Sequence, residues 1–529
     1  MAASSAEVAL ATKAESHRAF WRRRVNKKWN YRKMKKKKET LKGRRIAAGW
    51  AMRDVSTDQP VGIRGQFYLR LSEGVMDPVT VTSLALDNGD DAAIFLSCDG
   101  VGIPAFIVKM IRERIRKADR SIPAGKIIIN ATHAHTGGDL HDSPDEFPCN
   151  LPRMPGSEYQ KFFAGRAAEA VVEAWRSRQP AQVAWGFGYA TTSYSRRTVY
   201  FDDTSKRPEA IPRPGMTVNG HAVMYGNTND PQFSHFEAGA DPFINFLYTF
   251  TADGKLTGAI VNVPCPSQCS MHEWRLTADY WHEVRQNIKK QYGDVHILPQ
   301  CAAGGDLETI VLHYKKAHQR RLELKGTTQR REIADRITAA FSEVLEWASR
   351  DRREQTPLMH KARTIMLAKR RITREEYEDE LVQLARLKEE KFAAQGDPKE
   401  RLIHDSSLYA RRRRCEAVIK RYETQDAEPK LPMELHVVRL GDIAFASNRF
   451  ELYMDYMHRI QARSPAVQTF IIQLAGTEVG DGAGSYLATR RGAEGKGYSA
   501  TQYCNLVSPE GGQELVAETL QDLNELWKV

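Results

Sequence analysis

The sequence predicts an α/β fold in which a mixed sheet forms the main domain, with a charged helical insertion and a basic N-terminal tail. Three observations support this prediction. Six apolar runs typical of buried strands alternate with helix-like stretches after residue 45. Residues 316–430 are dense in charge, and their apolar residues recur every three or four positions, as in amphipathic helices. Residues 1–45 have no sustained apolar periodicity and carry a strong positive charge.

The net positive charge of the chain comes from the tail. Residues 1–45 hold 16 Lys and Arg residues against three acidic ones, a net charge of +13, whereas the whole chain of 529 residues has a net charge of +12. The aromatic residues Trp21, Trp29 and Tyr31 interleave the basic run, which suits binding to nucleic acid or an anionic surface. A solvated arm, docked on a neighbouring copy in a homo-oligomer, is the favoured interpretation.

Each predicted strand is followed by residues whose side chains can take part in catalysis or bind a metal. Helices predicted at 104–118 and 157–177 separate some of them. Ligands of open α/β sheets bind outside the carboxyl ends of strands, so we expect these residues at one edge. The strands and the residues that follow them are 92–98 before Asp99, 126–132 before His133, 258–264 before Cys265, 294–300 before Cys301, 436–448 before Glu451, and 468–476 before a glycine-rich loop and Tyr486.

The helical insertion divides the catalytic domain into two parts. We place the first part at 46–315, the insertion at 316–430 and the second part at 431–529. Within the insertion, the run Arg411–Arg414 is either a partner site or a solvated helix face, and the pattern favours the solvated face.

Cysteine usage and the N-terminus both favour the cytoplasm. Seven cysteines in a long chain are an odd number, which fits reduced thiols better than a disulfide framework. The N-terminus lacks the long apolar core of a secretory signal. No run approaches the roughly 18 apolar residues of a membrane span, so we expect none.

The clearest chemical motif is Thr132-His133-Ala134-His135-Thr136-Gly137-Gly138, directly after a predicted strand. Two histidines at a strand end can face one pocket, where a neutral imidazole binds zinc and a second one moves protons. Two ordinary polar loop histidines are the alternative. The pattern alone favours that alternative.

Two further motifs are weaker. Cys265 and Cys269 are separated by three residues, which is not the usual spacing of structural zinc sites, and buried core cysteines are the favoured interpretation. The turn Gly304-Gly305-Asp306 can approach a ligand or orient a metal-binding side chain, but it lacks the G-K-[ST] end of a phosphate-binding loop.

The order of these motifs resembles the catalytic domain of the neutral (non-lysosomal) ceramidase family. The resemblance covers roughly residues 46–315 and 431–529. The segments that carry it are GWAMRDVSTDQPVGIRGQ at 49–66, ATHAHTGG at 131–138, GAIVNVPCPSQ through LTADYW at 258–281, AAGGDLE at 302–308, NRFELYMDYMHRIQARS at 448–464 and SYLATRRGAEGKGYSATQY at 485–503.

This resemblance implies a zinc-dependent amidase that cleaves an N-acyl bond. In the family, two histidines, a glutamate and a tyrosine hold the zinc; His133, Glu451 and Tyr486 match three of them, and Cys265 occupies the position of the second histidine. His135 would be the acid/base group beside the metal. The remaining expectations are that Arg196 or Arg197 holds a polar or anionic substrate group and that Asp99 and Asp306 orient the metal ligands.

Three functions follow in order of preference. The first is a metal-dependent hydrolase of an amide bond, with Zn²⁺ or another divalent metal and a small-molecule or lipid-like acyl substrate. The second keeps the fold but cleaves an ester, a lactone or a carbohydrate derivative. The third is a non-catalytic binding or assembly protein that uses the basic tail. The family's catalytic serine falls near Cys301 and Ala302, so no nucleophile is expected there.

Overall fold

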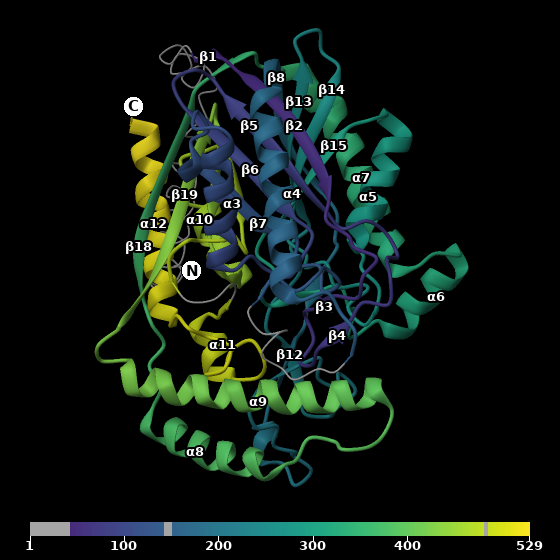
Figure 1. Ribbon diagram of the computed structural model, residues 1–529, viewed down its shortest axis with the longest axis vertical. Coiled ribbons are helices and arrows are strands. Elements are labelled where there is room, and N and C mark those ends of the chain that lie inside the picture. The colour runs from purple at the N-terminus through teal and green to yellow at the C-terminus, as the bar shows by residue number, and fades with distance from the viewer. Residues whose placement is uncertain (1–42, 142–150, 481–484, 529) are drawn as a thin grey trace, which may run out of the picture. The chain divides into compact units, whose positions relative to one another are not determined.

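The computed structural model describes residues 43–141, 151–480 and 485–528, and the chain from Arg44 onward forms one compact unit (Figure 1). The basic tail expected at residues 1–45 lies outside the described residues, apart from its last three. The binding partner expected for this tail is therefore not tested by the structure. Within the described ranges, every helix is too short or too polar to cross a bilayer.

In the described part of the chain, two sheets dominate. The first has eight strands in the order β15 (His296–Cys301), β14 (Leu256–Val263), β13 (Phe243–Thr251), β8 (Gln179–Tyr189), β2 (Ala47–Asp54), β5 (Thr80–Asp87), β6 (Ala92–Cys98) and β7 (Ile127–Ala131). The second has four strands in the order β18 (Leu358–Ala368), β19 (Lys430–Leu440), β20 (Ile443–Ser447) and β22 (Gln468–Ile472). Neighbours are antiparallel except β14–β15, β6–β7 and β20–β22, so both sheets are mixed, as the sequence predicts.

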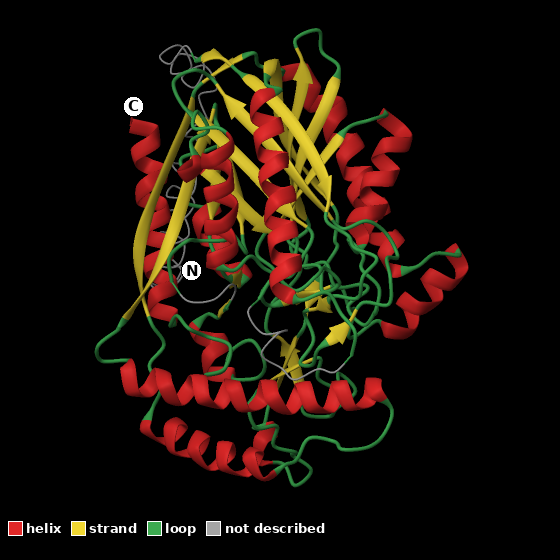
Figure 2. Cartoon of the chain, in the orientation of Figure 1, coloured by secondary structure: helices red, strands yellow, loops and turns green. Residues whose placement is uncertain are grey.

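The two sheets pack face to face, with helices on their outer faces (Figure 2). Strand β6 shows why its sequence is continuously apolar. Its Ile94 and Leu96 contact the helical layer, whereas Phe95 points the other way and its ring lies 5.0 Å from that of Phe445 in the second sheet. Alternate residues of a strand face opposite sides, so a strand covered on both faces needs apolar residues throughout.

The outer layers are formed by six helices. Helices α3 (Ala105–Ala118) and α4 (Gly156–Arg176) cover one half of the first sheet, and α5 (Tyr280–Tyr292) and α7 (Gln329–Ala348) cover the other half. Helices α10 (Met454–Gln461) and α12 (Pro509–Lys528) cover the second sheet. The remaining helices are α6 (Lys315–Lys325), α8 (Arg374–Glu389), α9 (Pro398–Thr424) and α11 (Arg490–Gly495).

Short strands complete the described structure. They are β1 (Arg44–Arg45), β3 (Gly62–Ile63), β4 (Arg70–Leu71), β9 (Tyr194–Ser195), β10 (Arg197–Tyr200), β11 (Ala222–Met224), β12 (Phe233–Phe236), β16 (Leu307–Glu308), β17 (Gln355–Thr356), β21 (Glu451–Leu452) and β23 (Tyr486–Leu487). The pair β21–β23 matters most for the site, because it places Glu451 directly beside Tyr486 in parallel register.

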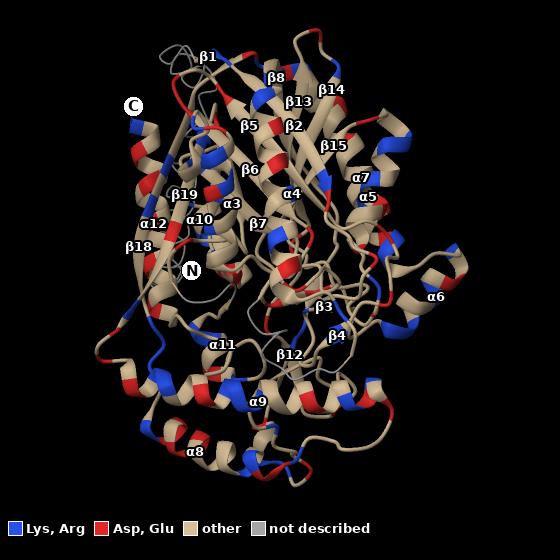
Figure 3. Ribbon diagram, viewed as in Figure 1, with Lys and Arg blue, Asp and Glu red and all other residues tan. Residues whose placement is uncertain are grey.

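The sequence predicts a helical insertion at residues 316–430. The structure differs, because this segment also contains the strands β17 and β18. Helix α7 packs its Ile337 and Phe341 into the core under the first sheet, and β18 is a full member of the second sheet. The charges of β18 hid its strand character: Lys361 and Arg363 lie on its outer face and pair with Asp522 of α12, at 2.6 and 2.8 Å. The hairpin of α8 and α9 stands apart from the sandwich, as does the exposed helix α6, and α8 and α9 are dense in charge (Figure 3).

The first sheet folds on itself and so brings distant strand ends together. Its two halves pair only where Ala47 and Ala48 of β2 meet β8. Ser97 of β6 and Asn130 of β7 both donate to the carbonyl oxygen of Pro299 in β15, at 2.5 and 3.2 Å. The loops that follow the predicted strands are then joined by hydrogen bonds from Thr132 N to Cys98 O, Ser267 Oγ to Thr132 O, Gly304 N to Gln473 Oε1, Gly305 N to Leu452 O and Ala475 N to Asn448 O.

Candidate active site

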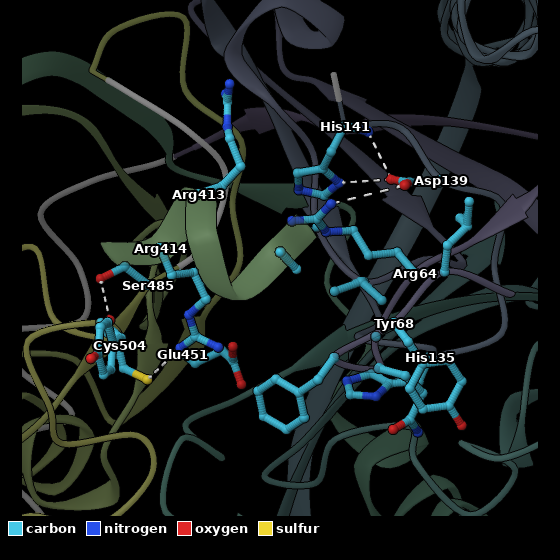
Figure 4. A pocket seen from close by; sticks show the side chains of 18 of the residues that line it. Arg64, Tyr68, His135, Asp139, His141, Arg413, Arg414, Glu451, Ser485 and Cys504 are labelled. Atoms are coloured by element: carbon cyan, nitrogen blue, oxygen red, sulfur yellow. Dashed lines mark hydrogen bonds and ion pairs between the residues drawn. The ribbon is translucent and has the colours of Figure 1, made fainter. Parts of the chain in front are cut away.

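A cavity of about 520 Å³ lies where these strand ends meet (Figure 4). Four residues expected at the site line it: His133, His135, Glu451 and Tyr486. The segment around β3 and the helix α9 supply the other walls. The cavity therefore combines loops of the sandwich with part of the helical hairpin.

His133 is held so that one ring nitrogen faces the cavity. It follows strand β7 with a left-handed backbone conformation (φ +63°) and is buried. Its Nδ1 lies 2.9 Å from the carbonyl oxygen of Val101, to which it can only donate, so in the neutral ring the lone pair is on Nε2. Nε2 lies 3.0 Å from Oε2 of Glu451. Burial lowers the pKa of His133, the Glu451 carboxylate raises it, and the net shift is upward.

Glu451 is the half-buried anion of the site. Burial alone would raise its pKa, but His133, Arg196 and the Tyr486 hydroxyl stabilise the carboxylate, and the pKa is lowered. Nη2 of Arg196 lies 3.9 Å from Oε2 of Glu451, and the Arg196 guanidinium lies 5.1 Å from the centre of the Tyr486 ring. Gly305 fits closely behind Glu451, since a Cβ atom there would lie 2.4 Å from the Glu451 carbonyl oxygen.

His135 is a half-buried neutral histidine beside His133. The two Nε2 atoms are 3.3 Å apart, and the Gln268 side chain lies 2.6 Å from Nε2 of His135. Burial, with help from His133 and Arg70, shifts the pKa of His135 well below its ordinary value. Gly65 supports the ring from behind, because a Cβ atom there would lie 2.5 Å from Cγ of His135. A neutral, well-positioned imidazole can both accept and donate a proton.

Cys265 is placed in the core and does not line the cavity. Its thiol donates to the carbonyl oxygens of Thr192 and Pro266, at 3.5 and 3.4 Å, and its side chain packs with Ala278 and Tyr280. Burial raises the pKa of this thiol well above its ordinary value. This environment fits the core interpretation of the sequence rather than the metal-ligand one.

The two arginines expected to hold substrate are buried and lie outside the lining of the cavity. Arg196 supports Glu451 and donates to the carbonyl oxygen of Gly305 at 2.7 Å. Arg197 is paired with Glu237 at 2.9 Å, and its other nitrogens donate to the carbonyl oxygens of Tyr498 and Lys496. The structure thus gives Arg197 a structural role in place of the expected contact with substrate.

The two aspartates expected to orient ligands do so only indirectly or not at all. Asp99 accepts two hydrogen bonds from Arg285, at 2.8 and 3.1 Å, and it is the carbonyl oxygen of Val101 that orients His133. Asp306 accepts from the backbone N–H of Met454, at 3.0 Å, and so anchors the start of α10 just after Glu451. Burial raises the pKa of Asp306 to about 6.

Sequence reasoning missed several residues of this cavity. Gln268 lies inside the CPSQC motif, but nothing in the motif distinguishes it from the cysteines. Arg64, Arg413 and Arg414 line the cavity, although the arginine run of α9 had the pattern of a solvated face. Tyr498 also lines it, with its ring 5.5 Å from that of Tyr486.

The donor atoms present fit three positions of a metal ion. Zinc bonds of about 2.0–2.2 Å in tetrahedral geometry separate ligand atoms by about 3.3–3.6 Å, and the 3.0 Å between Nε2 of His133 and Oε2 of Glu451 is close to that value. Within the described ranges, no three His, Cys, Asp or Glu side chains converge as metal ligands. The third protein ligand would therefore be Tyr486, whose side chain is hydrogen-bonded to that of Glu451.

Comparison with known proteins identifies the fold. No family model and no curated protein sequence matches the chain. Solved structures do match. Among them are a ceramidase complexed with C2, at a TM-score of 0.61 and 14% identity over 92% of this chain and 75% of the other, and the neutral ceramidase from Pseudomonas aeruginosa, at a TM-score of 0.61 and 14% identity over 91% and 74%. The chain has a neutral-ceramidase-like α/β fold.

Proposed function

We propose that the protein is a metal-dependent hydrolase that cleaves an amide bond, with Zn²⁺ as the expected metal. The observation that carries the proposal is the convergence of His133, His135, Glu451 and Tyr486 on one cavity of a neutral-ceramidase-like fold. The likeness concerns the fold, and the chemistry rests on the donor set. The expected cytoplasmic location rests on the sequence alone, and oligomerisation and a role for the tail stay predictions.

The residues divide the work of hydrolysis among them. His133, Glu451 and Tyr486 would hold the metal, which when bound polarises a carbonyl group and lowers the pKa of water. Arg196 keeps Glu451 ionised. His135, neutral at ordinary pH, accepts the proton of the attacking water and delivers it to the leaving amine. Gln268 fixes the orientation in which His135 does this.

The test is hydrolysis of a panel of N-acyl amides and matching esters by the zinc-loaded protein. We expect turnover of at least one amide, with His133→Ala abolishing it and His404→Ala, an exposed histidine on α9, leaving it unchanged. Esters cleaved faster than every amide would favour the second function instead. Activity that survives in His133→Ala would refute the proposed site.

A further inference from the structure

Helix α9 brings the positively charged side chain of Arg414 to the cavity (Figure 4). Arg413 and Arg414 of this helix line the cavity together with Arg64 from the segment after β3. The carboxylates in the lining are Asp139 and Glu451. Both are already engaged, since Glu451 faces His133 and Arg196, and Asp139 pairs with Arg64 at 3.9 Å. Neither of these two carboxylates is therefore left to pair with Arg414.

Arg414 is the arginine of the cavity lining that is best placed to bind an anion. Its guanidinium lies 5.6 Å from the centre of the Phe67 ring and 5.4 Å from that of Tyr503, so two aromatic faces hold it in place. Its Nη2 donates to the sulfur of Cys504, at 3.5 Å, which is a weak and neutral acceptor. Within the described ranges, no carboxylate pairs with it. A half-buried guanidinium with a neutral partner can bind a carboxylate or phosphate group of a ligand.

The position of Arg414 close to the candidate metal ligands limits the size of the ligand. The carbonyl oxygen of Cys504 accepts from the backbone N–H of Tyr486, at 3.0 Å, so one residue separates Arg414 from the Tyr486 strand. Tyr498 lines the cavity next to this strand, with its ring 5.5 Å from that of Tyr486. We therefore expect an anionic group bound by Arg414 to be a few bonds from the group that reaches Glu451.

The helix is fixed on the cavity by contacts along its length. Arg411 donates to the carbonyl oxygen of Pro214 at 2.9 Å, Arg412 to that of Leu387 at 2.9 Å and Arg421 to that of Gln502 at 2.6 Å. Ser406 accepts from the backbone N–H of Leu69 at 2.9 Å. The arginine run thus divides into anchors and cavity residues, and it is not the solvated face that its sequence pattern favoured.

Resting on the proposed function, we propose that the substrate is a small anionic amide, with a carboxylate or phosphate a few bonds from the scissile N-acyl bond, and that Arg414 is the residue that binds this anion. An uncharged lipid amide would leave the Arg414 guanidinium desolvated without compensation. Arg414, and not the sandwich, then selects the substrate.

The test compares three matched substrates of the zinc-loaded, full-length protein: N-acetylglycine, N-acetylethanolamine and its O-phosphate. We expect the two anions to have higher kcat/KM than the neutral compound, and their ratio separates carboxylate from phosphate. In Arg414→Gln, KM for the preferred anion should rise about 10- to 100-fold, with kcat and the neutral substrate little changed. Lys420→Gln, an exposed cation on the same helix, is the control.

A binding experiment separates this inference from the proposed function. Calorimetric titration with N-methanesulfonylglycine, which the enzyme cannot hydrolyse as an amide, should show binding that Arg414→Gln weakens by a similar factor, with N-ethylmethanesulfonamide as the neutral control. Arg414-dependent binding without hydrolysis of any substrate would keep the anion site and refute the amidase. Neutral amides cleaved as well as anionic ones, with no effect of Arg414→Gln, would refute the anion site. If Arg414→Gln does not fold, Arg414→Met, which keeps a long side chain without the charge, gives the same comparison.

Discussion

Replacing Cys265 by alanine distinguishes the two roles that the sequence leaves open for this residue. The thiol is 1% exposed and donates only to backbone carbonyl oxygens in the core. We therefore expect Cys265→Ala to keep its metal. In contrast, His133→Ala and Glu451→Gln remove donors that face each other at 3.0 Å, so both should lose it.

The size of the effect on stability follows from the same environment. Loss of one buried sulfur atom, with partial relaxation of the core around it, should cost about 1–2 kcal/mol. For a domain of this size, that corresponds to a decrease in Tm of about 1–2 °C. A metal ligand would behave differently, because its loss also removes the stabilisation that the bound ion supplies.

The assay is elemental analysis of metal per chain after reconstitution with zinc, combined with thermal unfolding with and without metal. Wild type and Cys265→Ala should contain the same amount of zinc and gain the same increase in Tm from it. If Cys265→Ala loses its zinc while remaining folded, Cys265 is a ligand, and the separation of its thiol from the cavity is wrong.

Four other predictions follow. His135→Ala should lower kcat by about 10²–10⁴-fold while zinc content stays at the wild-type value; loss of zinc would make His135 a ligand. Because the pKa of half-buried His135 lies well below 6.5, its protonation should reduce kcat only at pH values below 6.5, and a midpoint above pH 7 would contradict its neutrality. Gly305→Ala should displace Glu451, since the added Cβ would lie 2.4 Å from its carbonyl oxygen, and zinc affinity should fall in a calorimetric titration; unchanged affinity would show that the loop yields freely. Burial raises the pKa of Asp306 from 3.8 to about 6, so its contribution to stability is full below pH 3.8 and is lost as the pH rises through 6. Asp306→Asn should remove this loss, about 3 kcal/mol at most, and its advantage over wild type in denaturant unfolding should grow from pH 4 to pH 7; a constant difference would refute the shift.

The strands were predictable because burial on both faces leaves a continuous apolar signal. Five of the six runs identified in the sequence each coincide with one strand, and β6 shows the reason in its alternation of Ile94, Phe95 and Leu96 between two cores. The run at 436–448 was wrongly predicted as one strand: it contains the end of β19, a turn at Gly441 and the antiparallel strand β20. Strand β18 carries no such signal, because Lys361 and Arg363 on its outer face are neutralised by acidic residues of α12 far along the chain. Pairings over such distances are invisible to local pattern reasoning.

The candidate site was predictable where a side chain follows a strand directly. His133, Glu451 and Tyr486 follow strands or lie in strand pairs, and the meeting of strand ends brings them together. Arg197 and Asp99 follow the same logic but point into local ion pairs with Glu237 and Arg285. Motif position sets where the backbone goes, whereas the direction of a side chain depends on partners that the motif does not contain.

The structure separates the fold from the feature that would set specificity. The loops at the strand ends supply His133, Glu451 and Tyr486, the donors on which any hydrolysis of a carbonyl compound would rest. Arg414 comes from α9, a helix of the hairpin that stands apart from the sandwich. The hydrogen bond from Arg414 to Cys504, whose carbonyl oxygen accepts from Tyr486, connects the two parts. A change in α9 can therefore alter which amide is accepted without altering the donors that would cleave it, and this independence is what the matched substrates measure.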